Sequence, residues 1–250
     1  MARGQGESCY RPRDFLKFSF KSNLNHDIPL WNNFLDGKLR SRNFLNGFSF
    51  RMKGCGGIRV GFILASASLR RQELLKRLIE DFEIIISDFD ENQILFSGNP
   101  ETYVMTLALS KARGVQNERN MDSYILGADT IVLLEGKILG KPADREEACS
   151  MLRALSGKSH EVYSGIALLM GSRSLKVTEI AKTTVKFCEL STEEIESYLD
   201  GNEWQDKAGA YGIQGFAGKF IERIEGDYYN VMGLPLNTLY KLLRLYNIIL

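Results

Sequence analysis

The stretch RVGFILASASLRRQELL, residues 59–75, decides how the fold begins. Its first part, Arg59–Ala65, is an apolar run with the length of a buried strand. Its second part opens a helix predicted over residues 69–79, in which leucines recur on one face. A turn of small residues joins the two. A strand that leads directly into a helix in this way is typical of an α/β protein.

Strand and helix patterns continue to alternate along the rest of the chain, with hairpins among them. The further predicted strands are Phe82–Ile86, Tyr124–Leu134, Lys137–Leu139, Glu161–Met170 and Leu175–Cys188. The further predicted helices cover residues 100–115, 144–157 and 191–201, and a last one starts at Pro235. Hairpins pair strands antiparallel, whereas strands joined by a helix pair in parallel. We therefore predict an α/β fold around a mixed sheet with flanking helices.

Composition limits the cofactors and the compartment. The two histidines, His26 and His160, are far apart, as are the four cysteines Cys9, Cys55, Cys149 and Cys188. This argues against a zinc site or a disulfide framework and for a reducing compartment. A metal would therefore be held by carboxylates, which suits magnesium or manganese. No apolar run approaches the roughly 18 residues of a membrane helix, and no secretory signal is visible. We expect a cytoplasmic protein with no membrane partner.

Charge divides the chain near residue 57. Residues 1–57 hold ten Lys or Arg and four Asp or Glu, a net +6, and the remainder has a net −5, which gives the overall +1. A mildly acidic body is not typical of nucleic-acid-binding proteins, so we expect no nucleic-acid partner. Three interpretations of residues 1–57 stand: a basic arm, a targeting peptide, or upstream sequence before a true start at Met52. We favour the last, expect the extension to be poorly ordered or wrongly included, and place the folded domain at residues 58–250.

The turn after the first strand is a candidate phosphate site. Ser66 and Ser68 offer hydroxyls, and the N-terminus of the following helix favours an anion. Arg70 and Arg71 are unfavourable at that end of a helix unless an anion is bound there, and guanidinium groups match phosphate oxygens. A capped helix with two solvated arginines is at least as good an explanation of this stretch taken alone.

Carboxylates supply the candidate metal site. Asp129, followed by Thr130, interrupts an apolar strand, and a carboxylate there is costly unless it meets a metal, a cation or the solvent of a cleft. Asp90 and Glu91 follow the second strand and offer further oxygen ligands. Magnesium phosphate chemistry uses one or two such carboxylates. A turn aspartate with local hydrogen bonds is an equally good explanation of Asp129 taken alone.

Three lysines and one glutamine complete the candidate set. Lys111 lies near the core-facing side of its helix, and Lys141 sits in a rigid Gly-Lys-Pro turn. Taken alone, each is better explained as a snorkelling surface residue. Lys207 begins a stretch with three glycines between residues 209 and 215, which suits close approach of the backbone to a ligand. Gln214 offers an amide donor and acceptor to a pyrimidine edge, and a flexible loop is the alternative.

Six motifs occur in an order that resembles one known family. They are LASASLRRQELL, GADTIV, GKP, LSGKSHEVYSG, DKAGAYGIQG and GDYYNVMGLP, and with residues 58–243 they closely resemble the Maf family of nucleotide pyrophosphatases. The resemblance implies the inosine-triphosphate-pyrophosphatase-like fold, an elongated mixed sheet with two lobes around a cleft, in a protein that is often a homodimer. It also implies hydrolysis of a nucleoside triphosphate to the monophosphate and pyrophosphate with a divalent metal, Mg²⁺ or Mn²⁺.

The resemblance also implies roles for the candidate residues. Asp129 matches the catalytic acidic residue that activates water, and Glu91 matches the acidic residue that assists metal binding. We expect Asp129 to contact the metal as well. We expect Ser66 and Lys207 to contact the substrate as well. The positions that match phosphate contacts are Arg70, Arg71, Lys111 and Lys141. The positions that distinguish the branch acting on dTTP and UTP from the branch acting on 7-methyl-GTP are matched by Arg70, Thr130 and Gln214.

We therefore expect a dTTP and UTP pyrophosphatase that serves nucleotide-pool house-cleaning. Two alternatives stay open: a binding protein that inhibits septum formation, and a pyrophosphatase for modified pyrimidine nucleotides. One departure from the family pattern is Leu69, which stands where the motif usually has proline. The turn lacks the pre-set φ angle of proline, but no functional group is removed.

Overall fold

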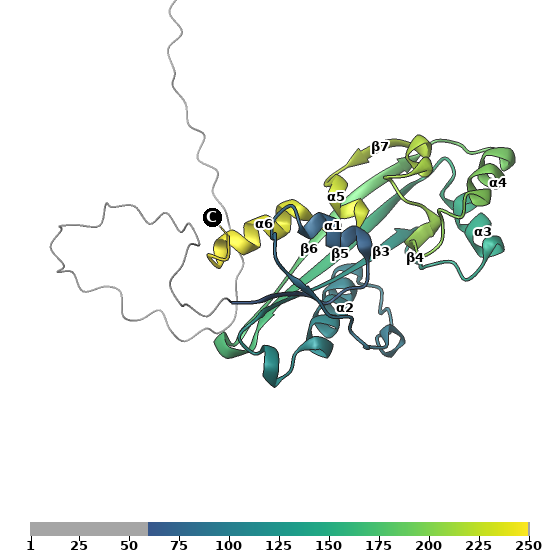
Figure 1. Ribbon diagram of the computed structural model, residues 1–250. Coiled ribbons are helices and arrows are strands. Elements are labelled where there is room, and N and C mark those ends of the chain that lie inside the picture. The colour runs from purple at the N-terminus through teal and green to yellow at the C-terminus, as the bar shows by residue number, and fades with distance from the viewer. Residues whose placement is uncertain (1–59, 250) are drawn as a thin grey trace, which may run out of the picture. The chain divides into compact units, whose positions relative to one another are not determined.

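The computed structural model describes residues 60–249, and the extension predicted at residues 1–57 lies outside them (Figure 1). The described residues form a seven-stranded sheet in the order β2-β1-β3-β5-β6-β7, with β4 paired to β3. β1 is parallel to β2 and β3, and the other pairs are antiparallel. This mixed sheet confirms the predicted fold class. The strands are β1 (Phe62–Leu64), β2 (Glu83–Ile84), β3 (Tyr124–Leu134), β4 (Lys137–Leu139), β5 (Ser159–Met170), β6 (Leu175–Phe187) and β7 (Ile221–Glu225).

Helices cover both faces of the sheet (Figure 1). The α-helices of the described part are α1 (Leu69–Leu75), α2 (Pro100–Val115), α3 (Arg145–Leu155), α4 (Thr192–Asp200), α5 (Tyr228–Met232) and α6 (Leu236–Leu245). α2 packs on β3 and β5, and α3 packs against α4. Side chains that alternate along β3 separate the layers, because Ile125 packs with residues of α2, whereas Leu126 packs with residues of α1 and α6.

A band of polar residues crosses the sheet between its hydrophobic clusters. On β3, Leu126 belongs to the cluster that includes α1 and α6, and Val132 belongs to the cluster that includes α3 and α4. Thr130 lies between them and pairs with Ser164 of β5. Asp129 occupies the same level on the opposite face, because successive strand residues point to opposite sides. Polar groups are therefore concentrated where two apolar halves of the sheet meet.

Two glycines allow α2 to lie directly on the sheet. A Cβ atom at Gly127 of β3 would lie 2.1 Å from the carbonyl oxygen of Ala108, and one at Gly165 of β5 would lie 2.4 Å from the carbonyl oxygen of Val104. Carbon atoms normally keep about 3.5 Å from such neighbours. Any larger residue at either position would lift α2 from the strands, so the glycines set how closely side chains of α2 approach β3.

Capping side chains begin several of the helices, among them α1, α3 and α4. The hydroxyl of Ser68 accepts the Arg71 amide at the start of α1. The carboxylate of Asp144 accepts the Glu147 amide at 2.8 Å at the start of α3. Residues 191 and 194 form a capping box at the start of α4. Each bond satisfies a backbone N–H that the first turn of a helix leaves without a partner.

The structure differs from the predicted elements in several places. α1 ends at Leu75, four residues before the predicted end at residue 79. The strand predicted at Phe82–Ile86 is only two residues long, because β2 is an edge strand that pairs with just two residues of β1. β7 and α5 were not predicted. The five residues of β7 are charged at three positions, as suits an edge strand, and α5 has only five residues, too few for a clear helical period.

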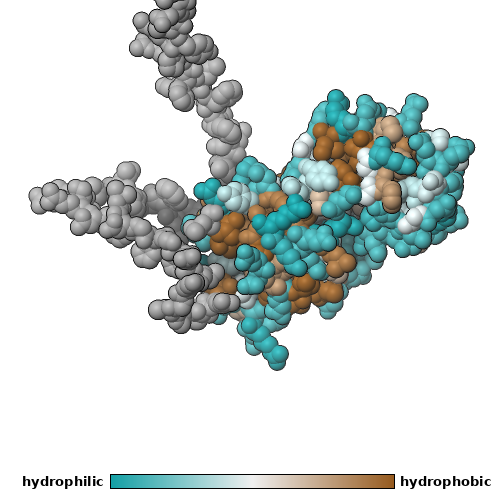
Figure 2. All heavy atoms as spheres, turned by 45° about the horizontal axis from the view of Figure 1, so that its top comes forward, coloured by the Kyte–Doolittle hydropathy of each residue, from teal (hydrophilic) through white to brown (hydrophobic). Residues whose placement is uncertain are grey.

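The surface of the described residues is mostly hydrophilic, with hydrophobic side chains gathered in two areas of one face (Figure 2). Within residues 60–249, no helix combines the length and the apolar character needed to cross a membrane. Cys149 and Cys188 are free thiols.

Candidate active site

A gap along one edge of β3 opens the middle of this strand. β1 pairs with β3 as far as Leu126, and β4 pairs with it from Val132 onward. None of the strands of the described part pairs with residues 127–131 on this edge, although β5 pairs with them on the other. At the gap the chain leaves β1 through Ser66 and enters α1. Ligands of α/β sheets bind where neighbouring strands diverge in this way.

Asp129 faces α2 and lies in a charge cluster beside the gap. Its Oδ1 is 2.5 Å from Nζ of Lys111, and the same Nζ is 2.8 Å from Oε1 of Glu91. The side chains of Lys111 and Asp129 are 14% and 8% exposed, whereas that of Glu91 is 53% exposed. One lysine therefore bridges two carboxylates, one of which is buried and the other open to solvent.

Burial controls the protonation of this cluster. It raises the pKa of Asp129 above its ordinary value, and the positive charges of Lys111 and Arg71 act against this effect. Burial and the charges of Asp129 and Glu91 also raise the pKa of Tyr103, a residue of α2 close to both carboxylates. A carboxylate with a raised pKa that is kept beside cations has the properties of a general base.

Arg71 approaches the gap from the other face of the sheet. Its Nε donates to the carbonyl of Gly233 at 2.8 Å, and its Nη2 donates to the hydroxyl of Thr130 at 3.2 Å. Its Nη1 lies 3.4 Å from Oγ of Ser66. The Thr130 hydroxyl is 2.7 Å from Oγ of Ser164. Burial lowers the pKa of Arg71, and nearby carboxylates act in the opposite direction. The guanidinium is held through all three nitrogens and keeps further N–H groups for an anion.

The glycine-rich loop between α4 and β7 carries two more candidates. Nζ of Lys207 donates to the carbonyls of Glu203 and Gln205 in the same loop. Burial lowers the pKa of Lys207, and the positive charge of Arg70 lowers it further, which places Arg70 close to this lysine. Gln214 is exposed on the loop.

Lys141 lies on a turn that is bonded to the same loop. It is exposed and follows Gly140, whose carbonyl accepts the Gly209 amide at 3.0 Å. The turn that follows β4 and the glycine-rich loop are therefore tied together. Lys141 is thus attached to the glycine-rich loop, and neither Lys141 nor Arg70 belongs to the buried charge cluster.

The predicted site residues fall into two bonded groups and a looser set. Asp129, Glu91 and Lys111 form the charge cluster. Arg71, Ser66 and Thr130 are hydrogen-bonded on the other face. The looser set consists of Arg70, Lys141, Lys207 and Gln214.

Sequence reasoning missed three residues of the site. Ser164 and Gly233 hold Thr130 and Arg71, and Tyr103 lies near the carboxylates. Ser164 lies in the LSGKSHEVYSG motif and Gly233 in GDYYNVMGLP. The two motifs therefore pointed to these segments, but the sequence did not show which of their residues contact the site. Tyr103 had no signal beyond its place eight residues before Lys111 on the same helix.

The carboxylates suit a hard divalent cation. Within residues 60–249 no group of three or more His, Cys, Asp or Glu side chains is placed to hold a metal. Asp129 and Glu91 nevertheless converge on the same ammonium group. Magnesium commonly uses one or two carboxylates, keeps several waters and takes its other oxygens from substrate phosphates. The donor set therefore fits a cation that arrives with a nucleotide better than one held in an all-protein cage.

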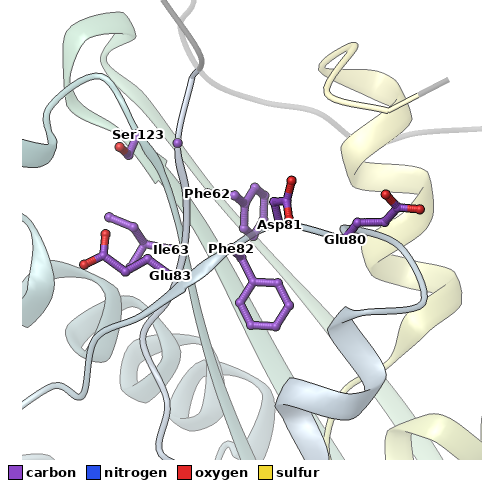
Figure 3. Close-up of a pocket in the computed structure, with 8 residues that line it drawn as sticks. Phe62, Ile63, Glu80, Asp81, Phe82, Glu83 and Ser123 are labelled. Atoms are coloured by element: carbon purple, nitrogen blue, oxygen red, sulfur yellow. The ribbon is translucent and has the colours of Figure 1, made fainter. Parts of the chain in front are cut away.

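A hollow elsewhere in the structure does not fit an anionic substrate. It has a volume of about 500 Å³, lies at the β1–β2 edge, and is lined in part by Glu80, Asp81 and Glu83 (Figure 3). These carboxylates would repel a triphosphate. None of the predicted site residues lines this hollow.

Comparison with known proteins agrees with the motifs. The model of the family described as Maf-like protein matches residues 61–246. The dTTP/UTP pyrophosphatase of Clostridium novyi is 56% identical over 180 residues, which cover 72% of this chain and 94% of that protein. The dTTP/UTP pyrophosphatase of Clostridium kluyveri is 52% identical over 182 residues, with 72% and 95% covered. Among solved structures, a HAM1 protein from Coxiella burnetii has a TM-score of 0.41 at 16% identity, with 74% of this chain and 98% of that chain covered. The match of the family model over most of the chain, together with relatives more than half identical, shows that this chain belongs to the family of Maf-like proteins.

Proposed function

We propose that this protein hydrolyses dTTP and UTP to the monophosphate and pyrophosphate, as a house-cleaning enzyme of the nucleotide pool. The observation that carries the proposal is the cluster in which Lys111 bridges Asp129 and Glu91 beside the gap in the sheet. Such a cluster offers a base, oxygen ligands and a cation within a few ångströms. The relatives from Clostridium novyi and Clostridium kluyveri, 56% and 52% identical, are named dTTP/UTP pyrophosphatases, which supports this choice of substrate.

Asp129 is the general base in this mechanism. Its buried carboxylate accepts a proton from the water that attacks the α phosphorus, and its raised pKa makes that proton transfer more favourable. Lys111 keeps the carboxylate ionised and oriented through its 2.5 Å contact. The same ammonium group stabilises negative charge that builds on the phosphoryl oxygens.

Asp129 and Glu91 would hold a divalent cation, Mg²⁺ or Mn²⁺. When bound, the cation supplies neutralisation of phosphate charge and a lower pKa for a bound water. Glu91 is the more exposed of the two carboxylates, so it is free to turn from Lys111 towards an arriving cation.

Basic groups around the gap bind the triphosphate. Arg71 offers the N–H groups that Gly233, Thr130 and Ser66 leave free, and Arg70 and the exposed Lys141 add further positive charge. Thr130 uses its hydroxyl on Arg71 and Ser164, so its effect on specificity is exerted through the position of Arg71. Lys207 contributes charge close to Arg70, and Gln214 pairs with the pyrimidine edge.

The setting of the enzyme is also part of the proposal. We propose a cytoplasmic homodimer without nucleic-acid or membrane partners, in which residues 1–57 form an extension outside the catalytic domain. The cellular pool of nucleoside triphosphates and the scattered cysteines support the compartment. Sedimentation of the full chain would test the dimer.

The test is pyrophosphate release from dTTP, UTP, CTP, GTP and 7-methyl-GTP, with Mg²⁺ or Mn²⁺, by wild type and Asp129→Asn. Turnover limited to dTTP and UTP and lost in the variant supports both the reaction and the role of Asp129. Turnover of 7-methyl-GTP instead would contradict the substrate assignment and leave the mechanism intact. Folded protein that hydrolyses none of the five nucleotides would contradict the proposed function.

A further inference from the structure

The glycine-rich loop that carries Gln214 is held by its own residues. Tyr211 belongs to the hydrophobic cluster that includes α3 and α4, whereas Ile213 packs against the cluster that includes α1 and α6. Gln214 follows at once and is exposed. The loop therefore crosses from one half of the sheet to the other at the point where this amide is presented.

Glu203 holds the part of the loop that follows Gln214 in the sequence. Its Oε2 accepts a hydrogen bond at 2.8 Å from the backbone amide of Phe216, which lies thirteen residues further along the chain. Its Oε1 occupies the space where a side chain of Gly215 would begin, since a Cβ atom there would lie 1.3 Å away. Gly215 has φ −104° and ψ −153°, an extended conformation that any residue adopts. Glycine is therefore needed here for room, and the occupant of that room is the Glu203 carboxylate.

Lys207 holds the loop on the near side of Gln214. Its Nζ donates to the carbonyls of Glu203 and Gln205. Its aliphatic stem fills the space beside Gly212, where a Cβ atom would lie 2.8 Å from Cε of the lysine. The backbone is thus fixed two residues before Gln214 and one to two residues after it.

We propose that Glu203 is a positioning residue for base selection, which fixes Gln214 through Gly215 and Phe216. This inference rests on the proposed function, in which Gln214 pairs with the pyrimidine edge. A glutamine amide can pair with uracil or, turned over, with cytosine, because it has both a donor and an acceptor. Discrimination between the two bases therefore requires the amide to be held in one place and one orientation. Glu203 supplies that restraint from outside the catalytic cluster.

The test compares Glu203→Ala, Gly215→Ala and the double variant, with Glu222→Ala on β7 as an exposed control. The readout is the ratio of kcat/KM for UTP to that for CTP. Each single variant is expected to lower this ratio about tenfold, because misplacement of a bonding group by about 1 Å has effects of this order or larger. The double variant is expected to match the single variants, because the methyl group added at position 215 meets no carboxylate once Glu203 is gone. Glu203→Gln keeps an acceptor and is expected to retain most of the discrimination.

Hydrogen exchange of the Phe216 amide gives a second readout that does not depend on turnover. Exchange is expected to be faster in Glu203→Ala and Gly215→Ala and unchanged in Glu222→Ala. Equal losses with UTP and CTP, which leave the ratio unchanged, would overturn the proposal, and so would additive losses in the double variant. If wild type releases no pyrophosphate, the proposed function fails by itself. The ratio of UMP to CMP affinity then tests Glu203, and an unaltered ratio in Glu203→Ala overturns its role.

Discussion

Replacement of Gly165 by alanine should greatly lower the catalytic rate while the protein still folds. Gly165 pairs with Asp129 in the register of β3 and β5 and lies under α2. The added Cβ would meet the carbonyl oxygen of Val104 at 2.4 Å and the amide nitrogen of Met105 at 2.8 Å. Since an ordinary contact needs about 3.5 Å, α2 must recede by about 1 Å.

The displacement acts on Lys111, which lies two turns further along α2. Its contact with Asp129 is 2.5 Å, so a shift of about 1 Å removes most of this hydrogen bond. Misplacement of this size costs catalysis on the order of 100-fold, and overpacking of a core costs about 1–3 kcal/mol of folding free energy. We expect Gly165→Ala to lose kcat for UTP by that order while it unfolds in urea at a lower but measurable midpoint.

Gly201→Ala is the matched control. Gly201 has φ −76°, and a Cβ atom there would lie 3.4 Å from its nearest neighbour, the carbonyl oxygen of Tyr198. It should fold with wild-type stability within about 0.5 kcal/mol and keep full activity. The reasoning would be refuted if Gly165→Ala kept activity within threefold of wild type, because α2 would then not need its close contact to place Lys111.

Further outcomes follow from the same contacts. The rate of pyrophosphate release should fall as pH falls through the raised pKa of Asp129, since only the ionised carboxylate accepts a proton; a pH profile of kcat/KM without this acidic limb would contradict the role. Lys111→Met should move that limb to higher pH and lower kcat about 100-fold, because a positive charge beside the carboxylate is lost. Arg71→Lys should raise KM about tenfold in steady-state kinetics, because one ammonium cannot replace the fork between Gly233 and Thr130. Burial lowers the pKa of His160 to about 4, so its contribution to the free energy of unfolding is fully present above pH 6.5, and about 3 kcal/mol is lost as the pH falls to 4. Urea unfolding of His160→Gln should therefore show a free energy of unfolding that depends less on pH over this range.

Local features of the sequence determined much of the fold. The apolar runs of β3 and β5, the β-rich run of β6 and the capping residues of α3 and α4 each lie within a short window of sequence. Their elements agree with the prediction. β7 is short and charged and α5 is short, so neither has a recognisable period in the sequence; they form through pairing with β6 and packing on the sheet. The family, too, could be assigned from motif order alone.

Tertiary structure decided how the candidate residues work together. Neighbours on β3, Asp129 and Thr130, point to opposite faces, so they serve different partners, Lys111 on α2 and Arg71 on α1. The sequence by itself named these four side chains as candidates. The contacts among them depend on strand register, on the closeness of α2 to the sheet and on a gap between β1 and β4, and these are distances between segments far apart in the chain. Residue types and spacing determined the chemistry that is available, and packing alone decided which atoms meet.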